Sequence, residues 1–306
     1  MRSEKWLTVP EIDQEAYLSK IRNYTSDENF SNFRSDSEWK IWESGDKNIG
    51  RISLDFIRLK NNLDLFLKHK ESFMLNDSVG TPILFDFSEI SGISSSTIQY
   101  ACDTINVYKF IETNTTSVNR IVEIGAGFGG LCRAISVLID FNEYIIIDLP
   151  EVIALQKKFL GQYPEIYNKV KFVNALDDSA IEQISQPDLT IACASIAELD
   201  LKTQVFYNIT LISKSKYAYI SYNTMFRKDS VHIFNVLYPI WVAKFSIRSW
   251  EGLQGTYFTM KREPNKIKKI FHNIFCQTTP LQFNVKVRVL KRTNKLKNQI
   301  KRLLSF

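Results

Sequence analysis

The chain has 306 residues, of which 44% are apolar and 24% are charged, proportions that are ordinary for a soluble globular protein. Its net charge of +6 is unevenly distributed, because residues 261–306 hold thirteen Lys and Arg against one acid and the rest of the chain sums to −6. No apolar run is long enough to span a bilayer, and residues 1–6 lack an apolar signal segment. We therefore expect a cytoplasmic protein.

Cysteine and histidine are too few and too scattered to predict a metal site. There is no Cys-x-x-Cys pair, and the three histidines are far apart in the sequence. The isolated cysteines fit a reducing compartment, and we assign no metal ligand.

Residues 1–95 are predicted to form an N-terminal helical cap region. A helical stripe of apolar residues runs over 52–66, and it either packs on the main domain or covers the substrate side as a lid. Residues 76–92 are rich in turn signals. A helix then begins at Ser95 or Ser96, either of which can cap it, and continues to about Glu112.

Residues 120–148 form the organising unit of the chain. The run 121–124 predicts a short buried strand, and Gly125, Gly127 and Gly129 after it allow a tight turn and a close approach of a ligand. A helical pattern follows over 128–139, and a second buried strand over 144–147 ends at Asp148. This strand, glycine loop, helix, strand and acid is how a doubly wound sheet holds the adenosine half of a cofactor.

Two cofactors fit such a unit, and Glu123 separates them. Asp148 lies 23 residues beyond Gly125, where an acid binds ribose hydroxyls in either case. Glu123 places a carboxylate where S-adenosylmethionine carries an ammonium group, whereas a nicotinamide dinucleotide would bring a pyrophosphate that this charge repels. The pattern therefore favours S-adenosyl-L-methionine.

Three sequence blocks resemble one known family. They are the glycine loop with Ile-Ile-Asp-Leu-Pro-Glu-Val after it, the segment 194–199 (Ala-Ser-Ile-Ala-Glu-Leu) and the segment 219–223 (Tyr-Ile-Ser-Tyr-Asn). Over residues 76–262 the chain resembles the sugar O-methyltransferases of bacterial surface-polysaccharide clusters, within the class I S-adenosylmethionine-dependent methyltransferases. The resemblance implies a Rossmann-like, seven-stranded α/β methyltransferase sheet over 96–262, with an N-terminal helical extension and a basic C-terminal tail over 263–306.

Further site residues follow the later strands of that sheet, at the edge where open α/β sheets bind ligands. Strands are expected over 170–173, 188–192 and 217–222, and an antiparallel hairpin over 244–250 and 256–261 closes the sheet. Beside the glycines, Glu123 and Asp148, the expected cofactor contacts are Leu149, Ala175, Leu176 and Ser195. Asp177 or Asp178 could accept a hydrogen bond from adenine.

The expected reaction is methyl transfer to a sugar hydroxyl, which requires a base to remove the proton. The candidates are Glu198, placed at the start of a helix running to about 212, and His232 in the following loop. Tyr222 and Asn223 are expected to bind the sugar acceptor. A divalent metal that lowers the pKa of the hydroxyl is an alternative to a base.

The basic tail is predicted to contact an anionic membrane surface or an acidic glycan, at the inner face of the cytoplasmic membrane, rather than nucleic acid. Two other functions stay open. One is a nicotinamide-dependent sugar oxidoreductase or epimerase, and the other is a non-catalytic scaffold that binds the cofactor.

Overall fold

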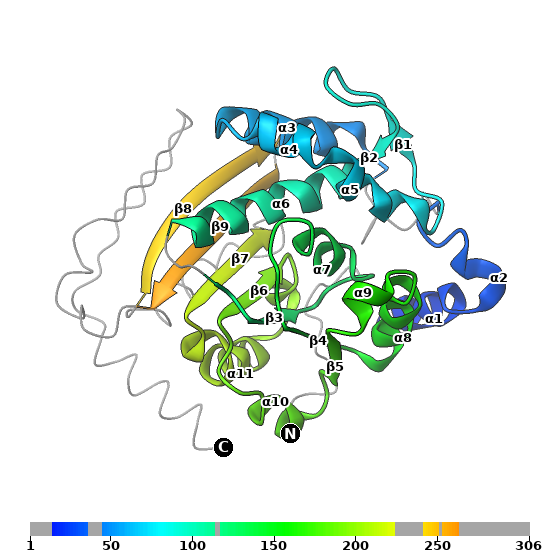
Figure 1. Ribbon diagram of the computed structural model, residues 1–306. Helices are drawn as coiled ribbons and strands as arrows, with labels where there is room; N and C mark the ends of the chain where they lie inside the picture. Colours follow the sequence, from blue (N-terminus) through cyan, green and yellow to red (C-terminus); the bar gives the residue numbers. More distant parts are fainter. Residues whose placement is uncertain (1–13, 36–44, 114–116, 224–240, 251–252, 263–306) are drawn as a thin grey trace. The chain divides into compact units, whose positions relative to one another are not determined.

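The computed structural model describes residues 14–35, 45–113, 117–223, 241–250 and 253–262 (Figure 1). All of them belong to one compact unit. The predictions for His232 and for the basic tail over 263–306 lie outside the described residues. Within the described residues, no helix is both long enough and apolar enough to cross a membrane.

A mixed sheet of seven strands forms the centre of this unit, in the order β5-β4-β3-β6-β7-β9-β8 (Figure 1). Neighbours among the first five strands are parallel, and β9 is antiparallel to both β7 and β8. The strands are β3 Arg120–Ile124, β4 Glu143–Asp148, β5 Val170–Asn174, β6 Leu189–Cys193, β7 Tyr217–Asn223, β8 Trp241–Trp250 and β9 Leu253–Arg262.

The sheet contains a switch point between β3 and β6. The chain enters at β3, moves outward through β4 to β5, and then returns to pair β6 with the free side of β3. The connections leaving the carboxyl ends of β3 and β6 therefore diverge in opposite directions. In open α/β sheets this divergence leaves the crevice in which ligands bind.

Helices cover both faces of the sheet because the buried strands are apolar on both sides. One face carries Ile121 of β3 in a core shared with α1, α6, α7 and α8, and the other carries Val122 in a core shared with α10 and α11. The bounds are α1 Gln14–Tyr24, α6 Ser95–Glu112, α7 Gly130–Ile135, α8 Pro150–Leu160, α9 Pro164–Tyr167, α10 Asp178–Glu182 and α11 Leu201–Thr210. Short 3₁₀ turns are η2 Ile196–Glu198 and η3 Ile212–Lys214.

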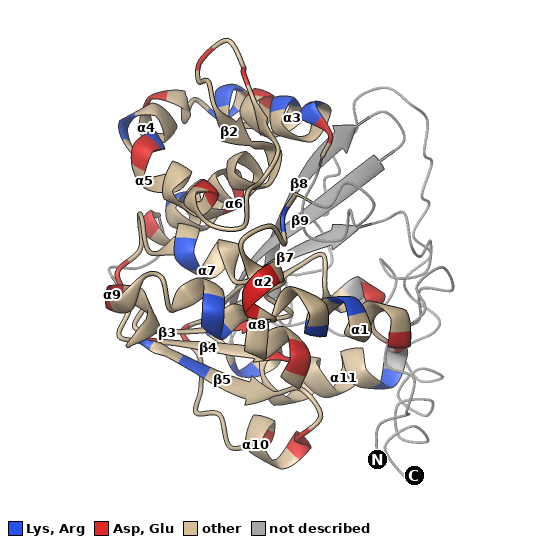
Figure 2. Cartoon of the chain, turned by 90° about the vertical axis from the view of Figure 1, so that its right-hand side faces the viewer, with Lys and Arg blue, Asp and Glu red and all other residues tan. Residues whose placement is uncertain are grey.

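The rest of the N-terminal region packs around α6. It comprises α2 Asp27–Phe30, α3 Lys47–Leu59, α4 Leu63–Lys68, α5 Lys70–Met74, η1 Leu75–Ser78 and the small hairpin β1 Leu84–Phe85 with β2 Ile93–Ser94. Leu54, Ile57 and Phe66 of this region share a core with Ile98 and Ile105 of α6. Figure 2 shows Lys and Arg together with Asp and Glu on these helices and on those that flank the sheet.

The mixed α/β class and the strands expected over 121–124, 144–147, 170–173, 188–192 and 217–222 are confirmed, each to within about one residue. The strands β8 and β9 include the ranges 244–250 and 256–261. Among the helices, α8 begins with Pro150 in its first turn as expected, because that position needs no amide hydrogen.

The helix predictions over 52–66 and 128–139 are wrong in their boundaries, whereas the one from Ser95 to Glu112 has the right boundaries but the wrong cap. The stripe over 52–66 is two helices, because Asn61 has φ +55° and turns the chain, which leaves Leu59 80% exposed. The helix expected over 128–139 covers only Gly130–Ile135, because the loop extends to Gly129. Neither Ser95 nor Ser96 caps α6; Ser94 does, with its Oγ accepting from the amide of Thr97 at 3.1 Å.

Candidate functional site

The glycine loop follows β3 at the switch point of the sheet. Gly125, Gly127 and Gly129 have φ of +70°, +55° and +95°, a region that side chains with a Cβ rarely adopt. The amide of Gly125 donates to the carbonyl of Ile147 at 3.0 Å, which ties the loop to β4. The sequence prediction of a glycine-dependent turn is therefore confirmed.

At two of these positions, glycine is needed because other residues of the protein pack against the loop, and not because a ligand must approach it closely. A Cβ at Gly125 would lie 2.5 Å from the Cβ of Ser195, and a Cβ at Gly129 would lie 3.2 Å from the side chain of Leu160. Ser195 also donates its hydroxyl to the carbonyl of Ile124. The loop after β3 and the turn after β6 are therefore in direct contact, so the structure brings Ser195 to the glycine loop. Its contact with the cofactor stays a prediction.

Asp148 ends β4 beside this loop, and its carboxylate is held by three donors. Oδ2 accepts from the amide of Ala126 at 3.0 Å and from Nε2 of Gln156 at 2.8 Å, and Oδ1 accepts from the amide of Leu149 at 2.9 Å. Burial raises the pKa of Asp148 to about 6, against the opposing effect of the three hydrogen bonds. The group is therefore mostly ionised at pH 7 and is able to accept hydrogen bonds from hydroxyls.

Gln156 is a functional candidate that the analysis of residue types missed. It lies on α8, and its Nε2 also donates to the carbonyl of Gly127 at 2.8 Å. One amide group therefore links the glycine loop to Asp148. A glutamine facing the core at helical spacing among Val152, Leu155 and Phe159 was the available signal, since a buried amide needs polar partners.

Glu123 lies in the core of the sheet rather than on a surface. Its side chain is 1% exposed, and Oε2 accepts from the hydroxyl of Tyr144 at 2.7 Å. Burial and, to a smaller extent, the charge of Asp148 raise the pKa of Glu123 to about 8, against the opposing effect of the hydrogen bond from Tyr144. At pH 7 this acid is mostly neutral. Its expected attraction for an ammonium group stays a prediction, and it requires the carboxyl group to be ionised in the core.

The turn after β6 carries a further acid. Ala194 has φ +56°, a strained value for a residue with a Cβ, and it directs the chain from β6 into η2. Glu198 ends η2, and burial raises the pKa of its carboxyl group to about 7. The prediction that Glu198 opens the following helix is wrong. Asp200 caps α11 by accepting from the amides of Lys202 at 2.9 Å and Thr203 at 3.1 Å.

The end of β5 contributes an exposed apolar side chain. Leu176 is 61% exposed, and the amide of Ala175 donates to the carbonyl of Asp148 at 2.8 Å. Leu149, in contrast, is buried in the core, so it offers its backbone rather than its side chain. Asp177 is already engaged as the cap of α10, accepting from Ala180 at 3.0 Å, so it is a weaker candidate for an adenine contact.

The end of β7 holds the two predicted acceptor-binding residues, which the structure places by their backbone. Tyr222 and Asn223 are the last two residues of β7, and in the sheet they pair with Thr256 and Gly255 of β9. Their position at the carboxyl edge agrees with the predicted acceptor side. Their side chains, like His232, lie outside the description, so their proposed roles stay predictions.

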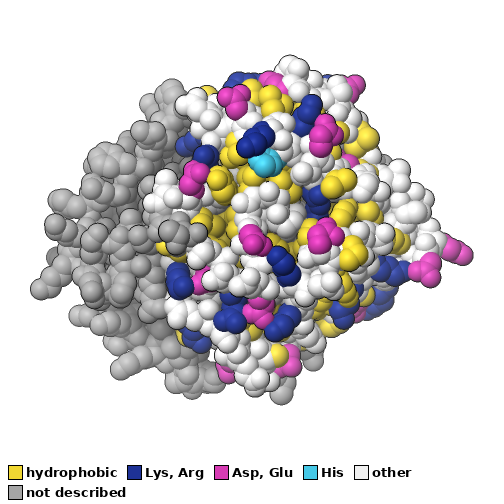
Figure 3. All heavy atoms as spheres, in the orientation of Figure 1, with side chains coloured by type: hydrophobic (Ala, Val, Ile, Leu, Met, Phe, Trp, Pro, Cys, Tyr) yellow, Lys and Arg dark blue, Asp and Glu magenta, His cyan; other side chains and the backbone are white. Residues whose placement is uncertain are grey.

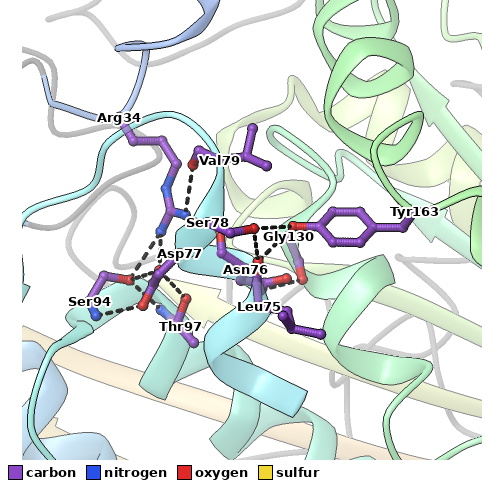
Figure 4. A network of polar contacts seen from close by, with 10 residues as sticks. All are labelled: Arg34, Leu75, Asn76, Asp77, Ser78, Val79, Ser94, Thr97, Gly130 and Tyr163. Carbon is purple, nitrogen blue, oxygen red and sulfur yellow. Dashed lines mark hydrogen bonds and ion pairs between the residues drawn. The ribbon is translucent and has the colours of Figure 1, made fainter. Parts of the chain in front are cut away.

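The outer side of the glycine loop is supported by the N-terminal region (Figure 4). Asn76 donates Nδ2 to the carbonyl of Gly130 at 3.0 Å, and the guanidinium of Arg34 lies 4.8 Å from the centre of the Phe128 ring. Phe128 is fully buried and also makes an edge contact with Phe33. These contacts favour packing over a lid for this part of the N-terminal region.

A buried ion pair holds that support in place (Figure 4). Nη2 of Arg34 lies 2.9 Å from Oδ1 of Asp77, with 1% and 6% of the two side chains exposed. Asp77 also accepts from the amide of Ser94 at 2.8 Å and from the hydroxyl of Thr97 at 2.7 Å. The cluster joins three segments that are distant in the sequence: residues 30–35, η1 and the start of α6.

The face of the molecule shown in Figure 3 has basic and acidic side chains interspersed among apolar ones. Among the described residues, several basic side chains pair with acids, as Lys169 does with Asp140 at 2.9 Å and Lys109 with Glu112 at 2.8 Å. The preference against a nucleic-acid partner stays a prediction.

Comparison with known proteins finds similar folds at low sequence identity. No family model and no curated protein matches the sequence. Among solved structures, magnesium protoporphyrin IX methyltransferase from Synechocystis PCC 6803 with bound SAM has a TM-score of 0.42 and 11% identity, over 55% of this chain and 81% of that one.

Two further solved structures have a similar fold at the same level of identity. TrmK from M. capricolum in complex with S-adenosyl-homocysteine has a TM-score of 0.39 and 11% identity, over 51% of this chain and 67% of that one. The N-methyltransferase NodS from Bradyrhizobium japonicum has a TM-score of 0.39 and 10% identity, over 52% of this chain and 93% of that one.

Proposed function

We propose that the protein is an S-adenosyl-L-methionine-dependent methyltransferase. The observation that carries this proposal is the pairing, at the switch point of the sheet, of a glycine loop after β3 with an ionised acid at the end of β4. The antiparallel β9 beside β7 supports it, since a nicotinamide-binding sheet continues with further parallel units.

The residues present fit the cofactor at two points. Asp148 is ionised and lies beside the glycine loop, where it can accept a hydrogen bond from a ribose hydroxyl. Leu176 exposes an apolar side chain directly beyond β5, where an adenine ring can pack. When bound, the cofactor supplies a methyl group made electrophilic by the sulfonium. The protein's part is to orient the acceptor in line with that methyl group and to exclude water.

A sugar hydroxyl is the proposed acceptor, on the strength of the family resemblance of residues 194–199 and 219–223. An alcohol needs to lose its proton as the new bond forms. Glu198 suits that role, because burial raises the pKa of its carboxyl group to about 7, which makes it a stronger base than an exposed glutamate. His232 is the alternative base, and a bound divalent metal is the alternative to a base.

The first experiment tests the cofactor by calorimetric titration of the full chain with S-adenosylmethionine and with NAD. The Asp148→Asn variant removes the ribose acceptor, and Asp140→Asn is the matched control, an aspartate before the amino end of β4 with 92% of its side chain exposed. The proposal predicts saturable binding of S-adenosylmethionine alone, weakened by Asp148→Asn and unchanged by Asp140→Asn. Binding of NAD instead would make the protein a candidate oxidoreductase or epimerase.

The second experiment tests catalysis and the acceptor. The protein is incubated with methyl-labelled S-adenosylmethionine and with glycans extracted from bacterial surfaces, free, nucleotide-linked or lipid-linked. Transfer of label to a glycan hydroxyl, lost in Glu198→Gln or in His232→Gln, identifies the base. Tight cofactor binding without transfer to any acceptor favours the non-catalytic scaffold.

Residues 263–306 are proposed to bring the protein to an anionic membrane surface, where lipid-linked glycan precursors would be met. Each basic residue near such a surface contributes on the order of 1 kcal/mol. Binding to vesicles with anionic lipid is compared between the full chain and a chain ending at residue 262. Equal and negligible binding by both would refute this contact.

A further inference from the structure

The side chain of Gln156 joins two parts of the candidate cofactor site that come from different strands. It reaches from α8 to the carbonyl of Gly127, in the loop after β3, and to Oδ2 of Asp148, at the end of β4, at 2.8 Å in each case. Gln156 is completely buried. A change in its position would therefore move the loop and the acid together.

The orientation of the Gln156 amide is fixed by its neighbours. Both of its acceptors are oxygen atoms, so a flipped amide would place Oε1 against them and lose both hydrogen bonds. In the orientation present, Oε1 is buried and finds no donor among the residues that the structure describes. A buried acceptor without a donor carries a free-energy cost. The favourable contribution of this amide therefore comes from the two hydrogen bonds that its Nε2 donates.

The hydrogen bonds of Asp148 leave it a limited capacity for a ligand. A carboxylate has about four lone-pair sites. Ala126 and Gln156 occupy two on Oδ2, and Leu149 occupies one on Oδ1. One site on Oδ1 remains for a hydroxyl. Among the described residues, these partners include no cation, so neutral donors alone stabilise the charged form of Asp148.

We propose that Gln156 is a positioning residue, which holds Asp148 as an ionised, single-site acceptor and fixes the glycine loop at Gly127, so that both parts of the cofactor site are preformed. This inference rests on the proposed function, because it assigns the ribose of S-adenosylmethionine to Asp148. Preorganisation of this kind increases affinity by removing the cost of ordering the site on binding.

Two titratable groups support the same assignment: Glu123, whose pKa depends on the charge of Asp148, and Tyr144, which donates a hydrogen bond to Glu123. Glu123 on β3 is the acid whose charge is coupled to that of Asp148, and its raised pKa of about 8 keeps it mostly neutral at pH 7. Tyr144 on β4 is also neutral, because burial raises the pKa of its hydroxyl. The hydrogen bond from Gln156 lowers the pKa of Asp148, against the effect of burial.

The test variant is Gln156→Met, which keeps the size of the side chain and removes both donated hydrogen bonds. The matched control is Gln204→Met, because Gln204 is also a buried glutamine on a helix, and its Nε2 donates to the carbonyl of Leu199 at 2.8 Å. Affinity for S-adenosylmethionine is measured by calorimetry from pH 5 to pH 8. We expect at least a tenfold loss for Gln156→Met, and a loss of affinity on acidification that begins at a higher pH than in the unaltered chain.

A double-variant cycle with Asp148→Asn separates positioning from general damage. If Gln156 acts through Asp148, its removal should weaken binding far less when Asp148 is already Asn. A merely structural role would lower the unfolding midpoint of Gln156→Met and Gln204→Met alike, and would leave the pH dependence of binding unchanged. Unchanged affinity in Gln156→Met, or full additivity in the cycle, would overturn the proposal.

A measurement without cofactor keeps the inference independent of the proposed function. The carboxyl carbon of Asp148 is followed by NMR during a pH titration of aspartate-labelled protein, with Asp148→Asn used for assignment. The pKa of Asp148 should rise in Gln156→Met and stay unchanged in Gln204→Met. If Gln156→Met does not fold, Gln156→Glu replaces it, and a larger rise is expected from the added acid. An unaltered pKa would refute the positioning role, whereas a chain that binds no S-adenosylmethionine would refute the proposed function alone.

Discussion

The acidic side chains at the two ends of strand β4 differ in their partners and in the direction of their pKa shifts. At the amino end, Glu143 lies 2.6 Å from Nζ of Lys171 and also pairs with Arg120, and these partners hold the pKa of Glu143 below its usual range. At the carboxyl end, Asp148 has neutral donors only among the described residues, and burial raises its pKa to about 6.

The neighbouring strands repeat this difference. Asp188, directly before β6, lies 2.5 Å from Nζ of Lys216. Burial alone would raise the pKa of Asp188, but the hydrogen bonds from Lys216, Arg120 and Asn119 hold it below its usual value. Toward the other end of β3, burial raises the pKa of Glu123 to about 8. Acids at the amino end are therefore paired with cations and have lowered pKa values. Those near the carboxyl end have raised pKa values, which is typical of a ligand site.

The largest effect is expected where a buried acid loses its ion-pair partner. In Arg34→Met, Asp77 stays buried without its ion pair, which should destabilise the protein by about 3–5 kcal/mol. Urea unfolding at pH 7 measures this. Arg34→Met combined with Asp77→Asn should recover part of the loss. If the free energy of unfolding falls by less than about 1 kcal/mol in Arg34→Met, the pair contributes no more than an exposed salt bridge, and the expectation is wrong.

Removing the charge of Glu123 should have the next largest effect, and it should stabilise the protein. The folded-state pKa of about 8 is above the ordinary glutamate pKa of 4.5, so the native state retains a proton that the unfolded state loses. The contribution of protonated Glu123 to the free energy of unfolding is therefore fully present below about pH 4.5, and it is lost as the pH rises to about 8. Glu123→Gln avoids that loss and can still accept from Tyr144, so we expect a gain on the order of 3 kcal/mol at pH 8.5 and little change at pH 4.5. Parallel pH profiles of thermal unfolding would contradict this expectation.

A smaller effect is expected for Asp148→Asn on cofactor affinity. Loss of a charged acceptor for a ribose hydroxyl should cost about 2 kcal/mol, or roughly 30-fold in affinity. In the unaltered chain, affinity should fall as the pH is lowered through about 6, because protonated Asp148 no longer accepts as a carboxylate. Calorimetric titration of both proteins checks this, and an affinity of Asp148→Asn that still falls through pH 6 would assign the titration to another group.

The smallest effect is expected at the amino end of the sheet. Lys216→Met removes the cation beside Asp188, but the lysine side chain is 61% exposed and the amides of Asn119 and Arg120 remain as donors. The free energy of unfolding should fall by at most about 1 kcal/mol, and the difference should shrink in about 1 M salt. A loss as large as that of Arg34→Met would remove the distinction between the two ends.

Part of the site is predictable because it is local in sequence. The glycine loop, Asp148 and the strands around them occupy one continuous stretch of 29 residues, and each of their conformations follows from residue type. The start of α11 was also predictable. Asp200 followed by Lys202 and Thr203 is a stronger cap signal than Glu198, because a short acid reaches the free amides of the first turn.

The sequence by itself therefore determined the succession of strands from β3 to β9 along the chain and the presence of a glycine loop followed by an acid. Only the tertiary structure decided how that loop is held. Gln156 reaches Gly127 across 29 residues, Asn76 reaches Gly130 across 54, and Ser195 lies against Gly125 from 70 residues away. Such contacts depend on which helix packs on which strand, because hydrogen-bond partners in a core are set by three-dimensional proximity and leave no periodic pattern in the chain.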